Sequence, residues 1–265
     1  MLINSVILVL REVLEAALMI SILLAASRFL QVRLRWLYYA LGIGLVGATT
    51  YAKLLNPISE LFEGVGQELV NASLQYGTFA ALSLVAFLIS RRRNVDNSNH
   101  STLPVTMAVA VALAVTREGS EVLIYVSGFV QMNDFLGSVG VGSLAGAAIG
   151  FSVGVLFYYL LLAIDSRRAL MISLLLLGLA ASGMSAQATG LLIQADWLSV
   201  SGPLWNTSAY IAEDSLTGQL LYALVGYEAS PSSIEVATYA ASITIMALST
   251  LLGWTLFAKR SDEPQ

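Results

Sequence analysis

ILVLREVLEAALMI, residues 7–20, holds three ionisable residues in an otherwise aliphatic run: Arg11, Glu12 and Glu15. AVTREGSEVLIYV, residues 114–126, repeats the same R-E-x-x-E spacing between apolar flanks with Arg117, Glu118 and Glu121. Burying a charge is costly unless the charge is paired or bound. Whether these six groups pair with one another or bind a ligand therefore bears on both the fold and the function of the chain.

The composition of the chain is that of a membrane protein. Of its 265 residues 57% are hydrophobic and 11% are charged, and the mean hydropathy is +0.77. Soluble domains carry roughly a quarter charged residues. The apolar residues also fall into blocks of about 18–25 residues, the length a helix needs to cross a hydrocarbon layer of ~30 Å. We therefore expect an all-α, multi-pass protein of the plasma membrane, which in a bacterium is the inner membrane.

The blocks predict seven transmembrane helices, at residues 2–27, 36–55, 65–90, 104–131, 138–163, 169–194 and 234–257. Basic residues follow the first, third, fifth and seventh blocks: Arg28, Arg33, Arg35, Arg91, Arg92, Arg93, Arg167, Arg168, Lys259 and Arg260. The other connections are acidic, with Lys53 as the exception. By the positive-inside rule, the N-terminus is expected outside and the C-terminus in the cytoplasm.

The two charged motifs predict an inverted repeat within a single domain, residues 1–265. Repeat one covers about 1–95 and repeat two about 103–195; they start on opposite sides of the membrane, and each opens with an R-E-x-x-E helix. Arg11 lies about ten residues into its helix, or ~15 Å at 1.5 Å per residue. Arg117 lies at a similar depth in its own helix, and such repeats are typical of transporters with a site at the bilayer midplane.

Two further segments complete the predicted architecture. Residues 195–233 are too polar to span and are expected to form a structured outer cap or a partly re-entrant loop before the last helix, 234–257. The glycine-rich run at 137–154, GSVGVGSLAGAAIGFSVG, favours close helix packing through small residues.

The charged motifs predict a cation site. Spacings of three and four residues place the arginine and both glutamates of each motif on one helix face. Together the motifs offer four carboxylates and two guanidiniums, a formal charge of −2. The chain has no cysteine, and its one histidine, His100, lies in a polar loop, which excludes thiolate, haem and multi-imidazole sites within this chain. Oxygen ligands alone favour hard cations such as iron, manganese, magnesium or calcium, or protons. The alternative is a pair of buried ion-pair clusters that fix helix packing.

The motifs REVLE, residues 11–15, and REGSE, residues 117–121, resemble the REGLE signatures of the Ftr1-type iron permeases, which include the bacterial EfeU-like proteins. ELFEG at 60–64 is similar to the family's Glu-Gly element, and residues 202–232 are similar to its outer loop. Three positions depart from the family pattern: Val13, Ser120 and Asn206. The resemblance covers nearly the whole chain and implies a seven-span iron importer, without a permanently bound cofactor and without enzymatic activity.

The resemblance implies roles for particular residues. Glu12, Glu15, Glu118 and Glu121 are expected to bind iron during its passage, and Glu63 is expected to be a metal ligand at the outer mouth. The two motif arginines, Arg11 and Arg117, would hold the carboxylates in register and limit the negative charge of the empty site. Gln75, Tyr76 and Gln187 either line the path or form hydrogen bonds between helices. A separate extracytoplasmic oxidase or iron-delivery protein is an implied partner, and no basic face for nucleic acid is present.

Other functions stay open at this stage. The ligand set does not distinguish Fe(III) from Fe(II), and a permease for manganese, lead or another divalent cation would use the same residues. A lipid-pyrophosphate phosphatase would need a Ser or His nucleophile or base and a phosphate-binding loop, and the predicted spans contain no histidine. A purely structural membrane scaffold is a further possibility.

Overall fold

The computed structural model describes residues 2–92, 102–129, 133–200 and 202–258. Within these ranges the chain is mostly helical, and the β-type backbone pairing consists of one isolated antiparallel bridge between Pro203 and Ser232. The all-α class expected from the sequence is confirmed. The helices are α1 (Leu2–Phe29), α2 (Arg35–Lys53), α3 (Leu55–Ser59), the 3-10 turn η1 (Leu61–Gly64), α4 (Gly66–Arg92), α5 (Thr102–Gly128), α6 (Asn133–Leu162), α7 (Ser166–Gln194), α8 (Leu216–Val225) and α9 (Ser233–Ala258).

Each of the seven expected spans coincides with a long helix. By length and apolar composition, four of the described helices could cross a membrane, at Gly66–Arg91, Gly137–Leu162, Ser166–Gln194 and Ser233–Thr255. α1 and α5 each carry the three charged residues of a motif, and α2 is short and carries a basic residue at each end. The count of seven spans therefore stays a prediction.

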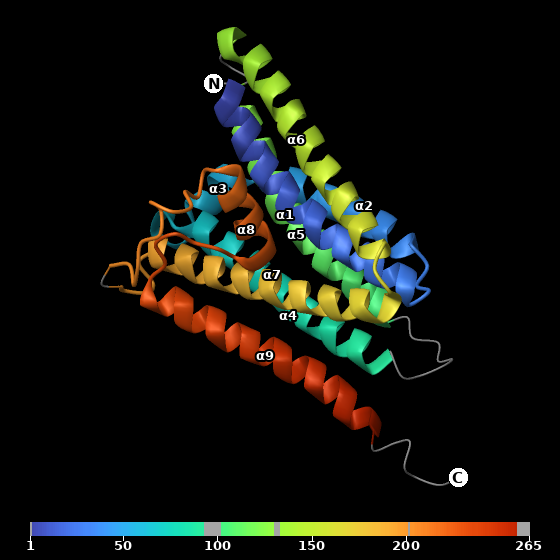
Figure 1. The fold of residues 1–265 in the computed structure, drawn as a ribbon. Coiled ribbons are helices and arrows are strands. Elements are labelled where there is room, and N and C mark those ends of the chain that lie inside the picture. Colours follow the sequence, from blue (N-terminus) through green and yellow to red (C-terminus); the bar gives the residue numbers. More distant parts are fainter. Residues whose placement is uncertain (1, 93–101, 130–132, 201, 259–265) are drawn as a thin grey trace.

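The connections that carry the basic residues gather at one end of the molecule. The α1–α2 and α6–α7 connections lie at the same end as the last turns of α4 and α9 (Figure 1). The first turn of α1, α3 and the segment at 202–232 lie at the other end. This arrangement agrees with the predicted orientation, which stays a prediction; Arg93, Lys259 and Arg260 lie outside the described residues.

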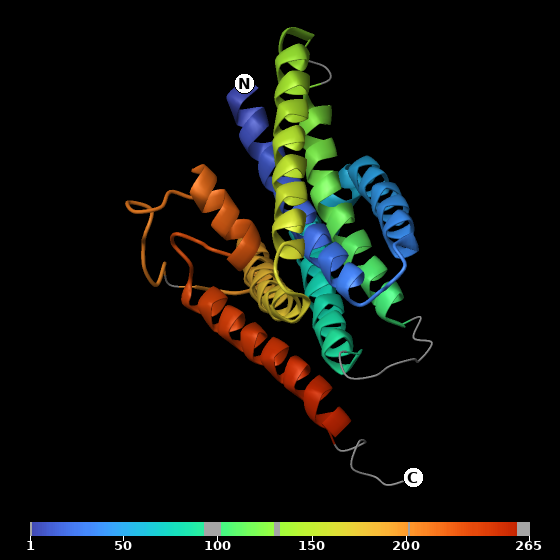
Figure 2. The same cartoon turned by 45° about the vertical axis from the view of Figure 1, so that its right-hand side comes forward.

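The helices of the two predicted repeats exchange partners. α1 packs along α6, α2 along α5, and α4 along α7 (Figure 2). The second helix of each triplet thus lies against the first helix of the other triplet, as a pseudo-twofold axis would require. α9 packs on α4 and α7, outside both triplets.

Glycines allow the closest of these contacts. α6 presents a glycine to α1 at every fourth residue: Gly142, Gly146, Gly150 and Gly154. A Cβ atom at Gly146 would lie 2.5 Å from the carbonyl oxygen of Val6. Ser21 of α1 also donates a hydrogen bond of 2.7 Å to the Gly154 carbonyl oxygen. The close packing expected from the glycine-rich run is confirmed.

An apolar core fills the half of the bundle that leads to the basic end. Its fully buried side chains come from α1, α4, α5 and α7 and include Ile22, Leu82, Met107, Val111 and Leu177. Dense packing of this kind leaves no room for a hydrated ion. The charged motifs lie at the outer edge of this core.

Candidate cation-binding site

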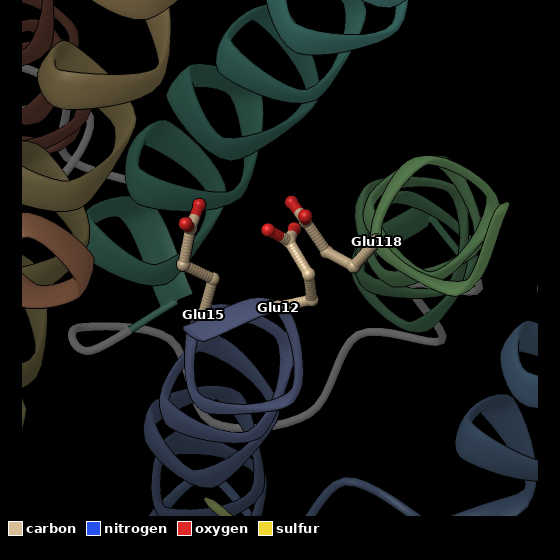
Figure 3. Close-up of side chains that lie close together, drawn as sticks. All are labelled: Glu12, Glu15 and Glu118. Carbon is tan, nitrogen blue, oxygen red and sulfur yellow. The ribbon is translucent and has the colours of Figure 1, made fainter. Parts of the chain in front are cut away.

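Three carboxylates from two helices meet at one point. Glu12 and Glu15 rise from α1, and Glu118 reaches toward them from α5 (Figure 3). One oxygen atom of each lies within 4.8 Å of the others. All three residues are buried, with exposed fractions of 5%, 3% and 3% in that order. The structure thus brings the two distant motifs into a single cluster, which we call the carboxylate cluster.

Arg117 of α5 is the cation at the centre of this cluster. Its Nη1 atom donates to both carboxylate oxygens of Glu118, at 2.7 and 2.8 Å, and to Glu15 Oε2 at 3.4 Å. Its Nη2 atom lies 3.2 Å from Glu121 Oε1. One buried guanidinium therefore offsets part of the charge of three glutamates, which leaves an excess of negative charge.

Arg11, the equivalent residue of the first motif, lies at the edge of the cluster. Its guanidinium stacks over the ring of Tyr222 in α8, 3.9 Å from the ring centre, and its Nε atom is 3.7 Å from Glu15 Oε1. Its side chain is 42% exposed, against 10% for Arg117. The two arginines therefore have different environments although their motifs are alike.

Helix α8, which carries Tyr222, lies against the side of the helix bundle. α8 ends at Gly226, whose φ of 66° is left-handed. A Cβ atom there would collide with Gly183 in the middle of α7. Tyr239 of α9 also donates to the Val225 carbonyl oxygen at 2.7 Å. The outer segment thus places the C-terminal end of a short apolar helix beside the bundle. Sequence reasoning missed Tyr222 because one aromatic residue among apolar ones carries no signal.

The carboxylate cluster is incompletely satisfied. Within the described residues, Glu12 Oε2 and Glu15 Oε1 are buried and have no hydrogen-bond partner, although Glu15 Oε1 lies 3.7 Å from Arg11 Nε. A buried carboxylate oxygen without a hydrogen bond is unfavourable unless a proton or a cation neutralises it. The arrangement can therefore bind a small cation through oxygen atoms of Glu12, Glu15 and Glu118.

Glu121 and Asn71 form the more accessible side of the cluster. The Glu121 side chain is 28% exposed and contacts Arg117. Asn71 of α4 donates from Nδ2 to Glu121 Oε1 at 3.4 Å and is itself buried. Sequence reasoning did not assign Asn71 to the site, because a single amide in an apolar helix does not reveal which neighbour it faces.

The remaining predicted residues are either exposed or hydrogen-bonded to residues outside the cluster. Glu63 is exposed on η1 with a left-handed φ of 66°, so its role at the outer mouth stays a prediction. Gln75 donates to Gln187 at 2.8 Å, and the hydroxyls of Tyr76 and Thr189 are 2.8 Å apart. Both contacts join α4 to α7, as expected for hydrogen bonds between helices. His100 lies outside the described residues.

The outer segment contains a titratable carboxylate. Burial, reinforced by the nearby charges of Glu235 and Glu213, raises the pKa of Glu228 to about 7, against the opposing effect of Arg11. The folded state then binds the proton more tightly than the unfolded chain, whose glutamate pKa is about 4.3. The stabilisation is complete below the unfolded pKa and is lost as the pH rises through 7.

We therefore expect the melting temperature of the protein to fall between pH 5 and pH 8 in part because of Glu228. In Glu228→Gln this contribution is absent, so the melting temperature of the variant should exceed that of the wild type at pH 8 more than at pH 5. Thermal unfolding of both proteins in detergent at several pH values measures the difference. Parallel curves for the two proteins would contradict this assignment.

Comparison with known proteins identifies the family. The sequence profile of the iron permease FTR1 family matches residues 2–264. Proteins named ferrous iron permease EfeU, from Escherichia coli O157:H7 and Shigella sonnei (strain Ss046), are 28% identical over 256 residues, which cover 87% of this chain and 88% of theirs. No solved structure matches the chain. The profile spans nearly the whole sequence, so the chain is a multi-pass membrane protein that belongs to the iron permease FTR1 family.

Proposed function

We propose that this protein imports iron across the inner membrane through a site formed by Glu12, Glu15, Glu118 and Glu121. The observation that carries the proposal is the carboxylate cluster itself: three buried carboxylates from two helices, two of whose oxygens have no hydrogen-bond partner in the described part of the chain. The family supplies iron as the cargo. Fe²⁺ is the proposed form because the relatives are named ferrous iron permeases.

The arginines set the affinity of the proposed site. Four carboxylates without a countercharge would hold a divalent cation too tightly for transport, since a transported ion must leave as well as bind. Arg117 contacts Glu15, Glu118 and Glu121 and keeps part of that charge neutral. Arg11 adds a second positive charge at the edge, where Tyr222 holds it.

The exposure of the charged residues supports access from the outer end. Glu121 and Arg11 are partly exposed, whereas the apolar core seals the cluster on the side of the basic connections. Iron would reach Glu121 first and then the buried glutamates. Release to the cytoplasm then requires the exchanged helix pairs of the two repeats to shift and open the core, as in alternating access. A separate extracytoplasmic oxidase or iron-delivery protein stays a predicted partner.

Uptake of radioactive iron by cells that express Glu12→Gln or Glu118→Gln tests the proposal. Each change removes one charge and one ligand at nearly constant volume, so we expect uptake to fall roughly tenfold or more, at least the loss seen when outer-shell partners of metal ligands are changed. Glu60→Gln, on the exposed connection before η1, is the control and should transport normally.

Normal uptake in both variants at normal expression would refute the glutamate site. The cargo is tested in the same cells by adding Mn²⁺ or Pb²⁺ as a competitor of iron and by measuring the uptake of each metal. Uptake of manganese or lead that exceeds iron uptake would identify the protein as a permease for another divalent cation.

A further inference from the structure

Helix α4 carries three polar residues on the face that leads to the carboxylate cluster. Glu68, Asn71 and Gln75 are three and four residues apart, so they lie one above the other on one side of the helix. Each has a buried side-chain oxygen without a hydrogen-bond partner in the described residues: Glu68 Oε2, Asn71 Oδ1 and Gln75 Oε1. We call these three residues the α4 oxygen ladder.

Unpartnered oxygens are concentrated in this region of the protein. Among the described residues, six carboxyl or amide groups have such an oxygen, and five of them belong to the carboxylate cluster or to the ladder: Glu12, Glu15, Glu68, Asn71 and Gln75. A buried polar group without a partner is energetically unfavourable. Asn71 and Gln75 are 5% and 2% exposed, so their amide oxygens bear this cost in full. A ligand that these oxygens share would remove it.

Asn71, the middle residue of the ladder, lies beside the cluster. Asn71 donates to Glu121, which is 3.2 Å from Arg117, so the amide of Asn71 is linked to the cluster through one carboxylate. In Figure 3 the carboxylate of Glu15 points toward the teal helix, α4, and the carboxylate of Glu12 points toward that of Glu118. Within the described ranges α1 and α4 do not pack directly on each other, although both contact α5 and α7.

We propose that Asn71 and Gln75 are cation ligands, which bind the passing ion through Oδ1 and Oε1, with Glu68 as the outermost member of the path. This inference rests on the proposed function and adds a third helix to its site. Hard divalent cations take about six or more oxygen ligands, more than the three clustered carboxylates supply one by one. Neutral amide oxygens complete the shell without adding negative charge, which keeps binding weak enough for release.

The orientation of the Asn71 amide is consistent with this role. Its NH₂ group faces the carboxylate of Glu121, as expected for a donor beside an anion, and this leaves Oδ1 without a protein partner. The amide of Gln75 is oriented likewise: its NH₂ group donates to Gln187 of α7, and its Oε1 atom has no hydrogen-bond partner in the described residues. In both residues protein contacts hold the nitrogen and leave the oxygen for a ligand.

Binding of Fe²⁺ to the purified protein, measured by anaerobic titration calorimetry, tests the proposal together with the KM of iron uptake. Gln75→Met and Asn71→Leu remove the oxygen at similar volume, and we expect each to weaken Fe²⁺ binding and raise KM about tenfold. Asn71→Asp keeps an oxygen at the same place and should bind Fe²⁺ at least as tightly as the wild type.

Gln187→Met is the matched control for Gln75→Met. It breaks the same hydrogen bond between α4 and α7 but leaves Gln75 Oε1 in place, so it should bind Fe²⁺ with wild-type affinity. Equal losses in Gln75→Met and Gln187→Met would show that Gln75 acts in packing and would overturn its role as a ligand. If Gln75→Met does not fold, the comparison of Asn71→Leu with Asn71→Asp decides the proposal.

The same measurements distinguish a wrong assignment of the α4 oxygen ladder from a wrong assignment of the glutamate site. Wild-type Fe²⁺ affinity in both Asn71→Leu and Gln75→Met, together with lost binding in Glu118→Gln, would exclude α4 and leave the glutamate site intact. Wild-type affinity in Glu118→Gln would refute the glutamate site itself.

Discussion

Replacing Arg117 by methionine is expected to abolish iron uptake and to prevent the protein from accumulating in folded form. Arg117 is the shared partner of Glu15, Glu118 and Glu121, at distances of 3.4, 2.7 and 3.2 Å. Removing one partner from a buried ion pair typically costs about 3–5 kcal/mol, because the other charge remains buried and unpaired. Here three carboxylates lose a partner at once, in a protein class whose total stability is only about 5–15 kcal/mol.

Size-exclusion chromatography of the detergent extract and thermal unfolding measure this effect. Arg11→Met is the matched control, because it removes the same residue type from the other motif, where the side chain is 42% exposed and its carboxylate contact is 3.7 Å. Exposed ion pairs contribute about 0–1 kcal/mol, so Arg11→Met should fold normally. Arg117→Met combined with Glu118→Gln should recover folded protein in part, but not uptake.

A folded Arg117→Met protein with the melting temperature of the wild type would contradict the assignment. It would mean that the glutamates are neutralised by some other means, such as bound protons. The double variant distinguishes ion pairing from neutralisation by bound protons. If bound protons neutralise the glutamates, adding Glu118→Gln to Arg117→Met does not increase stability.

The charged helices were predictable because their signal is local. Three ionisable residues at helical spacing in an apolar run predict a functional helix face, and the repeated motif predicts the second half of the site. Glu12, Glu15 and Glu118 accordingly meet in the structure. The helix bounds also follow the sequence within a few residues, since apolar length and basic flanks determine them.

The environment of the site was not predictable, because it depends on contacts between helices. Nothing in the repeated motif distinguishes Arg11 from Arg117; the difference arises because α8 places Tyr222 over Arg11. Asn71 is likewise one polar residue in a long apolar helix, and its link to Glu121 exists only once α4 packs on α5. Glu63 was expected at the outer mouth from the resemblance; the structure places it on an exposed turn, and its role as a ligand stays a prediction.

Replacing Gly146 by leucine should separate α1 from α6 and thereby destroy the site from a distance. A Cβ atom at Gly146 would lie 2.5 Å from the carbonyl oxygen of Val6 and 2.9 Å from the amide nitrogen of Leu10. These are backbone atoms of a helix and cannot rotate away as a side chain could. Overpacking that forces the backbone to move typically costs about 1–3 kcal/mol and occasionally more.

The displaced part of α1 is the part that carries the first motif. Val6 and Leu10 lie within two turns of Glu12, so a shift of α1 moves Glu12 and Glu15 away from Glu118 on α5. We expect iron uptake by Gly146→Leu to be lost and its melting temperature to fall. Gly146→Ala should show a smaller fall in the same direction.

Gly140→Leu provides the control on the same helix. A Cβ atom there meets no other atom within 4 Å, so the added side chain should leave both the melting temperature and uptake unchanged. Equal melting temperatures for Gly146→Leu and Gly140→Leu would contradict the close contact between α1 and α6. Retained uptake in Gly146→Leu would mean that α1 can move by the width of a side chain without releasing the cation. A cluster whose ligand atoms lie within 4.8 Å of one another does not allow that, because such a shift exceeds the tolerance of a metal–oxygen bond.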